Sequence, residues 1–286
     1  MYNAGLVLEG GGMRGIFTAG VLDFFMDKGV EFKNIIGVSA GACHACSFLS
    51  RQYGRAKKVS VDYIDDKNYC SVYNLIKTGD LFGEKFVYDE IPRKLDIFDN
   101  EAYLNNPSKL FVTVTDVESG EPAYIELRDC DKEVDLVRAS ASLPLVSRIV
   151  EFRGMKYLDG GISDSIPIRK IQEMGMKKNV IVLTQPEGYV KEPNKAMTFI
   201  KMKYRKYPQL IRKMENRYLI YNDTLRYIKQ QENIGEVFVI RPEEALPLKR
   251  IEKDKEKLED TYKKGYKRAS ALYDDMVKFL KEQEEY

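Results

Sequence analysis

Ser39 is the residue whose setting most directly suggests chemistry. It is the central residue of Gly37-Val38-Ser39-Ala40-Gly41, which matches the pattern G-x-S-x-G. The apolar run at 34–38 predicts a strand, and the small residues from Ala40 to about Arg51 predict a helix. A serine on such a sharp strand-to-helix turn presents its hydroxyl as a nucleophile. The alternative is a serine that only caps the helix, and the pentapeptide leaves both interpretations open.

A glycine loop, Gly10-Gly11-Gly12-Met13-Arg14-Gly15, follows an apolar run at residues 4–9. It fits the dinucleotide pattern G-x-G-x-x-G, which also expects an acid at the end of the second strand. That strand ends in Val38-Ser39-Ala40 and has no acid. The loop could instead aim the backbone N–H groups of Gly10, Gly11 and Gly12 at one negative oxygen, as in an oxyanion hole. A plain tight turn is the third interpretation.

A nucleophilic serine normally needs a base, and the chain has a single histidine, His44. Five residues along a helix turn His44 roughly 140° away from the direction of Ser39. The base is therefore expected to be a carboxylate or a lysine. Asp159 is the first candidate, because it follows the apolar run 155–158 and precedes two glycines. Asp116 is the second, and an ordinary turn aspartate is the alternative for both.

Three motifs in this order resemble the patatin-like phospholipase family. They are the glycine loop at 10–15, G-x-S-x-G at 37–41 and Asp159-Gly160-Gly161. The segment 138–145 (RASASLPL) is also similar to the family segment that precedes its aspartate. The resemblance covers about residues 4–185. The remainder, 186–286, is similar to the C-terminal helices of a bacterial branch of the family.

The resemblance implies a three-layer α/β/α fold with a largely parallel central sheet, in one domain over residues 1–286. It implies hydrolysis of lipid acyl esters by a Ser39–Asp159 dyad, with the Gly10–Gly12 amides as oxyanion hole and no metal or cofactor. Glu9 departs from the family, which often has Asp there. Arg14 matches a basic position, and could hold the loop, favour anionic head groups or form a surface salt bridge. The residues expected to support the motifs are Arg14, Gly15, Gly37, Gly41, Gly160 and Gly161.

The elements that must position these residues alternate between strand and helix at the start of the chain, which favours a parallel sheet covered by helices. Strands are expected at residues 4–9, 34–38, 110–115, 123–127, 149–152, 155–158, 179–184 and 236–241. Helices are expected at residues 16–28, 40–51, 55–66 and 132–140, from Pro167 onward, and as long amphipathic helices over 195–231 and 249–283. A turn at 118–121 predicts a hairpin.

Composition narrows the function further. The chain has 286 residues with 44% hydrophobic residues, a net charge of +2 and four cysteines. The near-neutral balance does not favour a nucleic-acid partner. No apolar run approaches the ~18 residues of a membrane span, and the N-terminus lacks the basic start of a signal peptide. We expect a cytoplasmic protein with reduced thiols, in contact with the membrane at most peripherally.

Two weaker signals remain. Cys43 and Cys46 fit C-x-x-C, but without a second ligand cluster they are expected to be packing residues rather than a zinc site. Residues 195–217 interleave basic and apolar side chains, which favours either docking on anionic lipid or a solvated helix face. A nucleotide-binding protein and a catalytically silent lipid-binding protein are the competing functions. The head group, the acyl chain and the oligomeric state stay open.

Overall fold

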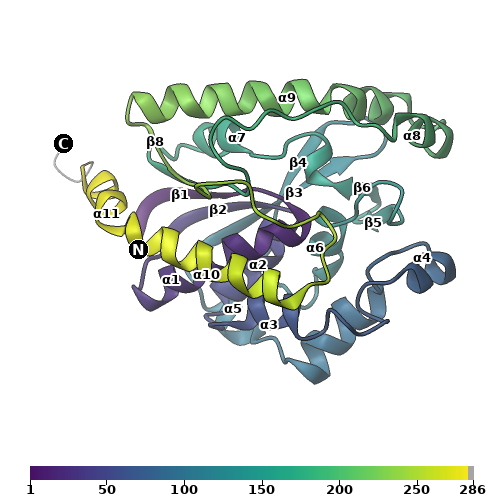
Figure 1. The fold of residues 1–286 in the computed structure, drawn as a ribbon, viewed down its shortest axis with the longest axis horizontal. Helices are drawn as coiled ribbons and strands as arrows, with labels where there is room; N and C mark the ends of the chain where they lie inside the picture. The colour runs from purple at the N-terminus through teal and green to yellow at the C-terminus, as the bar shows by residue number, and fades with distance from the viewer. Residues whose placement is uncertain (283–286) are drawn as a thin grey trace.

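The computed structural model describes residues 1–282, and one mixed sheet runs through its centre (Figure 1). The strands are β1 (Tyr2–Leu8), β2 (Phe32–Val38), β3 (Lys109–Asp116), β4 (Pro122–Glu126), β5 (Val150–Phe152), β6 (Met155–Asp159), β7 (Asn179–Val182) and β8 (Val237–Ile240). Their order is β5-β6-β3-β2-β1-β7-β8, and β4 also pairs with β3. Strands β3, β2, β1, β7 and β8 are parallel, whereas β4 to β6 pair antiparallel. The expected strands and the hairpin are confirmed.

The central strands are apolar on both faces because helices cover both. In β1, Leu6 and Leu8 belong to the core on one side of the sheet and Val7 to the core on the other. Successive residues of a strand point to opposite faces, so a strand buried on both sides becomes a continuous apolar run. In Figure 1, α7 and α9 lie over one face and α1, α2 and α10 lie under the other. This is the expected three-layer arrangement.

The helices are α1 (Ile16–Asp27), α2 (Ala40–Leu49), α3 (Arg55–Val61), α4 (Val72–Thr78), α5 (Asn100–Leu104), α6 (Val134–Ser140), α7 (Ile168–Glu173), α8 (Met197–Lys203), α9 (Pro208–Asn233), α10 (Lys255–Ala271) and α11 (Tyr273–Lys281). Short 3₁₀ helices occupy Gly12–Gly15 (η1) and Gly160–Ile162 (η3), and a π-helix occupies Phe86–Leu95 (η2). No helix within residues 1–282 is long and apolar enough to cross a membrane.

Several expected helix boundaries are wrong. The helix expected over 195–231 is two helices, because Pro208 starts α9 and cannot continue α8. The helix expected over 249–283 begins only at Lys255 and is interrupted at Leu272, and its expected end at residue 283 lies outside the described residues. Helix α2 stops at Leu49, and Arg51 takes a positive φ of 55°.

The segment α4–η2–α5, between residues 72 and 104, was not predicted. Its elements are short, and η2 contains Pro92, which sequence rules treat as a helix breaker. Val72, Tyr73 and Ile76 of α4 are exposed. Phe86 and Ile91 of η2 are nevertheless buried in the core between the helices.

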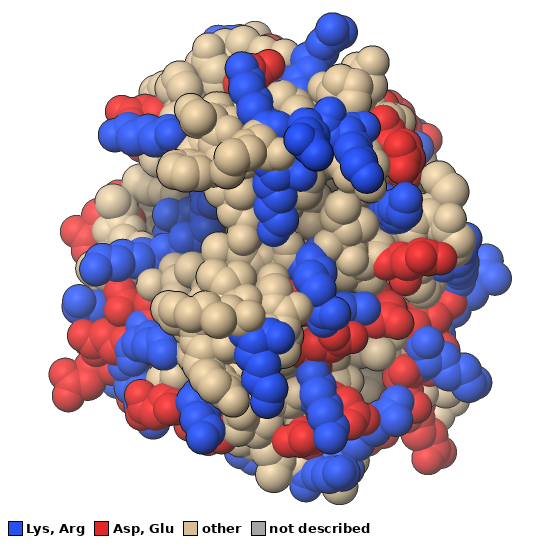
Figure 2. All heavy atoms as spheres, turned by 90° about the vertical axis from the view of Figure 1, so that its right-hand side faces the viewer, with Lys and Arg blue, Asp and Glu red and all other residues tan. Residues whose placement is uncertain are grey.

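The segment 195–217 packs partly on the core and is partly exposed. Ile200, Tyr204, Leu210 and Met214 are buried in one cluster with residues of β6 and η3. Phe199 and Met202 are exposed instead. They stand among exposed basic residues at Lys195, Lys201, Lys203, Arg205, Lys206 and Arg212. Figure 2 looks onto this side of the molecule and shows Lys and Arg side chains interspersed with uncharged surface.

Glycines allow α10 to pack closely against α1, joining the C-terminal part of the chain to the N-terminal part. A Cβ on Gly265 would lie 2.0 Å from the carbonyl oxygen of Phe17, and a Cβ on Gly20 would lie 2.1 Å from that of Tyr262. The Tyr262 hydroxyl also donates to Asp23 at 2.6 Å. Because backbone cannot give way as a flexible side chain can, both positions require glycine.

Gly265→Ala is therefore expected to lower the free energy of unfolding by about 1–3 kcal/mol, although alanine is the better helix former. Urea unfolding followed by circular dichroism measures it. Lys267→Ala, at an exposed position of α10, is the control and should be near neutral. A Gly265→Ala protein as stable as the parent would show that the two helices can separate without cost.

Candidate active site

Ser39 occupies a strained turn between β2 and α2. Its backbone has φ 54° and ψ −122°, a conformation that non-glycine residues rarely adopt. A Cβ on Gly37 would lie 2.7 Å from the Cα of Ala42, and a Cβ on Gly41 would lie 2.6 Å from the carbonyl oxygen of Leu8. Both glycines are thus needed for the tight turn. The Ser39 side chain makes no capping hydrogen bond to α2, so the helix-cap interpretation is wrong.

Ser140 holds the backbone of this turn. Its hydroxyl oxygen accepts the N–H of Ser39 at 2.8 Å, and its O–H donates to the carbonyl of Thr113 at 2.7 Å. All three residues are buried. Ser140 lies in the segment 138–145. This segment resembles one in the family, but the sequence predicted no role for Ser140. Only the packing of α6 against β3 brings it to the turn.

The glycine loop lies beside Ser39. β1 and β2 are adjacent and parallel, with Leu8 opposite Gly37, so the loops after both strands meet at one sheet edge. A Cβ on Gly10 would lie 3.1 Å from the Ser39 Cβ. Within residues 1–282 the N–H groups of Gly10 and Gly11 donate no hydrogen bond. These unpaired donors line a pocket together with Ser39 and Gly12.

Glu9 and Arg250 anchor the two ends of the glycine loop. The Glu9 carboxylate accepts the Tyr221 hydroxyl at 2.6 Å, the Thr184 N–H at 2.6 Å and the Thr184 hydroxyl at 3.0 Å. The Met13 N–H donates to the Arg250 carbonyl at 3.0 Å. The Glu9 side chain reaches Tyr221 of α9, and this hydrogen bond ties the loop to the C-terminal half of the chain.

Asp159 ends β6 opposite Val114 of β3 and is buried. Its Oδ1 accepts the Gly161 N–H at 2.7 Å, whereas Oδ2 has no partner of ordinary hydrogen-bond geometry within residues 1–282. A Cβ on Gly160 would lie 2.2 Å from the Thr113 carbonyl, so glycine is required after the aspartate.

The surroundings of Asp159 act on its charge in opposite directions. Burial raises its pKa, and the nearby hydroxyl of Ser39, then Arg217 and the Gly161 N–H, act to lower it. The hydroxyl therefore lies close to the carboxylate without a fully formed bond, as is common in enzymes without substrate. A carboxylate with a raised pKa accepts a proton more readily than an ordinary one.

Neither Asp116, the second candidate base, nor His44, which was not expected to be the base, has this setting. Burial lowers the pKa of His44 to about 4, so its imidazole is neutral near pH 7. It makes no hydrogen bond within the described residues. Asp116 accepts both the N–H and the hydroxyl of Ser119 at 2.7 Å, which is the turn role given as its alternative.

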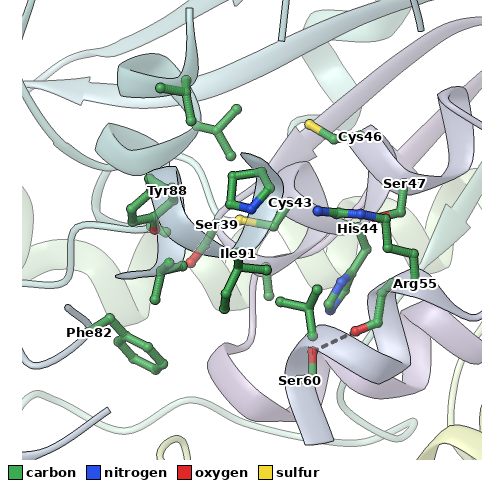
Figure 3. Close-up of a pocket in the computed structure, with 18 of the residues that line it drawn as sticks. Ser39, Cys43, His44, Cys46, Ser47, Arg55, Ser60, Phe82, Tyr88 and Ile91 are labelled. Atoms are coloured by element: carbon green, nitrogen blue, oxygen red, sulfur yellow. Dashed lines mark hydrogen bonds between the residues drawn. The ribbon is translucent and has the colours of Figure 1, made fainter. Parts of the chain in front are cut away.

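An apolar pocket opens on one side of Ser39 and encloses about 1290 Å³, part of it open to solvent. Figure 3 shows Ser39, Tyr88 and Phe82 toward one end of it and Ser47 and Arg55 at the other. The unpredicted helix η2 supplies one wall with Val87, Tyr88, Ile91 and Pro92. The pocket suits a flexible apolar chain attached to a group at Ser39.

A second pocket, here called the polar pocket, lies on the other side of Ser39. Ser39, Gly12 and Leu143 line both pockets. The cationic residues that line the polar pocket are Arg14, Lys191, Arg217 and Arg250. Arg217 belonged to the basic surface expected over 195–217, and that placement is wrong, because its Nε donates to the Gly161 carbonyl beside Asp159.

The cysteines of the C-x-x-C pattern are free thiols. The Cys46 thiol donates to the Ala42 carbonyl at 3.4 Å within α2, and burial raises the pKa of Cys43 to about 12. Within residues 1–282 no three or more His, Cys, Asp or Glu side chains are grouped to hold a metal ion. The thiols are packing residues beside the apolar pocket.

The fold and this set of motifs define the class of protein. A family model described as patatin-like phospholipase matches residues 6–170, more than half of the chain. The chain belongs to the patatin-like phospholipase family. A second model, a domain of unknown function, matches residues 207–281.

Individual relatives agree with this membership. The uncharacterized protein YjjU of Escherichia coli is 34% identical over 63% of this chain and 52% of its own length. The mouse 1-acylglycerol-3-phosphate O-acyltransferase Pnpla3 is 29% identical over 48% of this chain and 33% of its own. The chain thus spans about half or less of these relatives. VipD of Legionella pneumophila has the same fold, with a TM-score of 0.50 at 15% identity over 96% of this chain and 67% of VipD.

Ser140→Ala is expected to lower the free energy of unfolding by about 1–3 kcal/mol, because it leaves the buried Ser39 N–H and Thr113 carbonyl without that partner. Urea unfolding measures the change. Ser60→Ala is the matched control: its hydroxyl is also buried but only returns to the Ala56 carbonyl within α3. Equal losses for both variants would contradict a bridging role for Ser140.

Proposed function

We propose that this protein hydrolyses acyl esters of lipids, with Ser39 as nucleophile and Asp159 as general base. The observation that carries the proposal is the free Oδ2 of a buried Asp159 beside the hydroxyl of a strained Ser39. The unpaired glycine-loop amides beside Ser39 supply the third part of an acyl-transfer site. The apolar pocket suits the acyl chain.

The reaction proceeds in two steps. Asp159 takes the hydroxyl proton as the Ser39 oxygen attacks the ester carbonyl, and the N–H groups of Gly10–Gly12 stabilise the negative oxygen that forms. The alcohol leaves with the proton from Asp159, and the acyl group stays on Ser39. Water then gives a proton to Asp159 and attacks the acyl-serine. Asp159 passes this proton to the Ser39 oxygen as the bond to the acyl group breaks, which releases the fatty acid and restores the hydroxyl.

The names of further relatives support the substrate class. A region of 184 residues is 28% identical to the lysophospholipase NTE1 of Lodderomyces elongisporus, and covers 60% of this chain and 12% of that protein. Because the chain spans only part of such relatives, their activity comes to it as a proposal. We also propose that residues 1–286 act as one domain, because β8, α9 and α10 extend the same sheet and core.

A fluorophosphonate, which reacts with activated serines, is expected to label the wild-type protein at Ser39. Ser39→Ala should abolish the label, and Asp159→Asn should slow labelling and hydrolysis of a short-chain ester by at least ~10³-fold, because the base is removed. Peptide mass mapping identifies the labelled serine. Asp116→Asn is the matched carboxylate control and should label like the parent.

Labelling at another serine, or none in the wild type, would contradict this function. A protein that stays unlabelled but shifts its melting temperature with a dinucleotide would instead be a nucleotide-binding protein. One that binds lipid without labelling would be a catalytically silent member of the family.

We further propose that the exposed surface of α8 docks on anionic membranes. Phe199 and Met202 project among Lys201, Lys203 and Arg205, with a single acid, Glu215, paired to Lys201 at 2.6 Å. Apolar side chains surrounded by cations suit an interface of acyl chains beneath anionic head groups. α4, with its exposed apolar residues, lies on the same side of the molecule (Figure 1).

The double variant Phe199→Ser with Met202→Ser is expected to weaken co-sedimentation with phosphatidylglycerol vesicles by about tenfold, because it removes the inserted apolar area. Binding should also fall with added salt. Ile234→Ser removes an equally exposed side chain at the opposite end of α9 and should have no effect. Undiminished binding of the double variant would rule out α8 as the docking surface.

A further inference from the structure

The polar pocket carries an unusual excess of positive charge. Arg14 comes from η1, Lys191 from the loop after β7, Arg217 from α9 and Arg250 from the loop after β8. Within residues 1–282 none of the four forms an ion pair with a carboxylate. This differs from the surface of the molecule, where charged side chains are extensively paired.

These four side chains are also poorly satisfied as hydrogen-bond donors. Within residues 1–282, Nε of Arg14 is buried without a partner. Arg217 donates to the Gly161 carbonyl, and Lys191 packs against the Tyr221 ring at 4.1 Å. Hydrogen bonds at 2.8 and 3.0 Å between Lys191 and Asn222 hold its backbone in place. The cations are therefore positioned by the fold but mostly lack acceptors.

The proximity of like charges costs free energy in the empty pocket. Burial, together with Arg217, Arg250 and Arg14, lowers the pKa of Lys191 to about 7, and the nearby Glu9 only partly offsets this. Burial and then Arg250 likewise lower the pKa of Arg217. A bound anion would relieve this repulsion, and the cations would regain favourable partners.

The two carboxylates of the pocket are already engaged. Glu9 accepts hydrogen bonds from Tyr221 and Thr184, and Asp159 accepts one from Gly161 and faces Ser39. Neither is available to hold an amine or a choline. The pocket therefore favours an anion. The positively charged part of a zwitterionic head group would find no carboxylate partner there.

The position of the pocket relates it to the reacting ester. Ser39 lies between the polar pocket and the apolar pocket, and lines both. A substrate whose ester carbonyl is at Ser39 and whose acyl chain fills the apolar pocket would place its alcohol portion in the polar pocket. The group recognised there is thus the head group of the leaving alcohol.

We propose that the polar pocket binds the phosphomonoester of an acylglycerol phosphate through Arg14, Lys191, Arg217 and Arg250. This rests on the proposed lipid hydrolase function and names its substrate class. A phosphomonoester carries about −1.5 to −2 charges and three acceptor oxygens, which suits four cations opposed by two carboxylates. The planar guanidinium groups of arginine can also donate two parallel hydrogen bonds to the oxygens of one phosphate.

Calorimetric titration of the Ser39→Ala protein, which cannot turn over, tests the proposal independently of catalysis. The ligands are oleoylglycerol phosphate, monooleoylglycerol, oleoyl lysophosphatidylcholine and inorganic phosphate. We expect oleoylglycerol phosphate to bind at least ~10-fold tighter than each of the others. In the Ser39→Ala background, Lys191→Met and Arg250→Gln should each reduce this preference several-fold, and exposed Lys195→Met should preserve it.

Equal affinity for oleoylglycerol phosphate and monooleoylglycerol would overturn the proposal, and so would inorganic phosphate binding as tightly as the lipid. A preference unaffected by either pocket variant would also overturn it. Melting temperatures of the variants exclude loss of folding as the cause of weaker binding. If fluorophosphonate labelling fails but the phosphate preference holds, the hydrolase function fails and the phosphate site stands.

Discussion

The close approach of two parallel strand ends is the constraint on which this molecule depends. β1 and β2 lie side by side, and the loops that follow them meet at one edge of the sheet. Ser39 accepts a strained backbone there, and Gly10, Gly37 and Gly41 leave the space that this turn needs. The strain persists because β3 and α6, acting through Thr113 and Ser140, hold the turn from the other side.

The C-terminal part of the chain completes the site rather than forming a separate appendage. Tyr221 of α9 binds Glu9 at the start of the glycine loop, and Arg217 binds the carbonyl of Gly161 after the aspartate. The carbonyl of Arg250 holds the loop at Met13. These residues lie beyond the 6–170 region of the patatin-like model, and Tyr221, Arg217 and Arg250 fall within the 207–281 region of unknown function. That region therefore contributes to the environment of Ser39 in this chain.

The site is also divided electrostatically. Ser39 separates an apolar pocket walled by α2, α3 and η2 from a polar pocket with four cations. In the polar pocket the charged groups are partly withdrawn from water, where electrostatic interactions are stronger than at the surface. The same burial raises the pKa of Asp159. The sheet edge is buried beneath α9 and its flanking loops. This burial both raises the pKa of Asp159 and strengthens the positive potential beside it.

The sequence by itself determined the order of the strands along the chain, the motifs at Ser39, the glycine loop and Asp159, and the family to which they belong. These features are local: glycines, apolar runs and turn residues act within a few positions of one another. Only the tertiary structure decided the break at Pro208, the π-helix that walls the apolar pocket and the bridging role of Ser140. It also turned Arg217 inward and brought Arg14, Lys191 and Arg250 to the same pocket. Residues so far apart along the chain leave no periodic signal, because their convergence depends on how helices pack over the sheet.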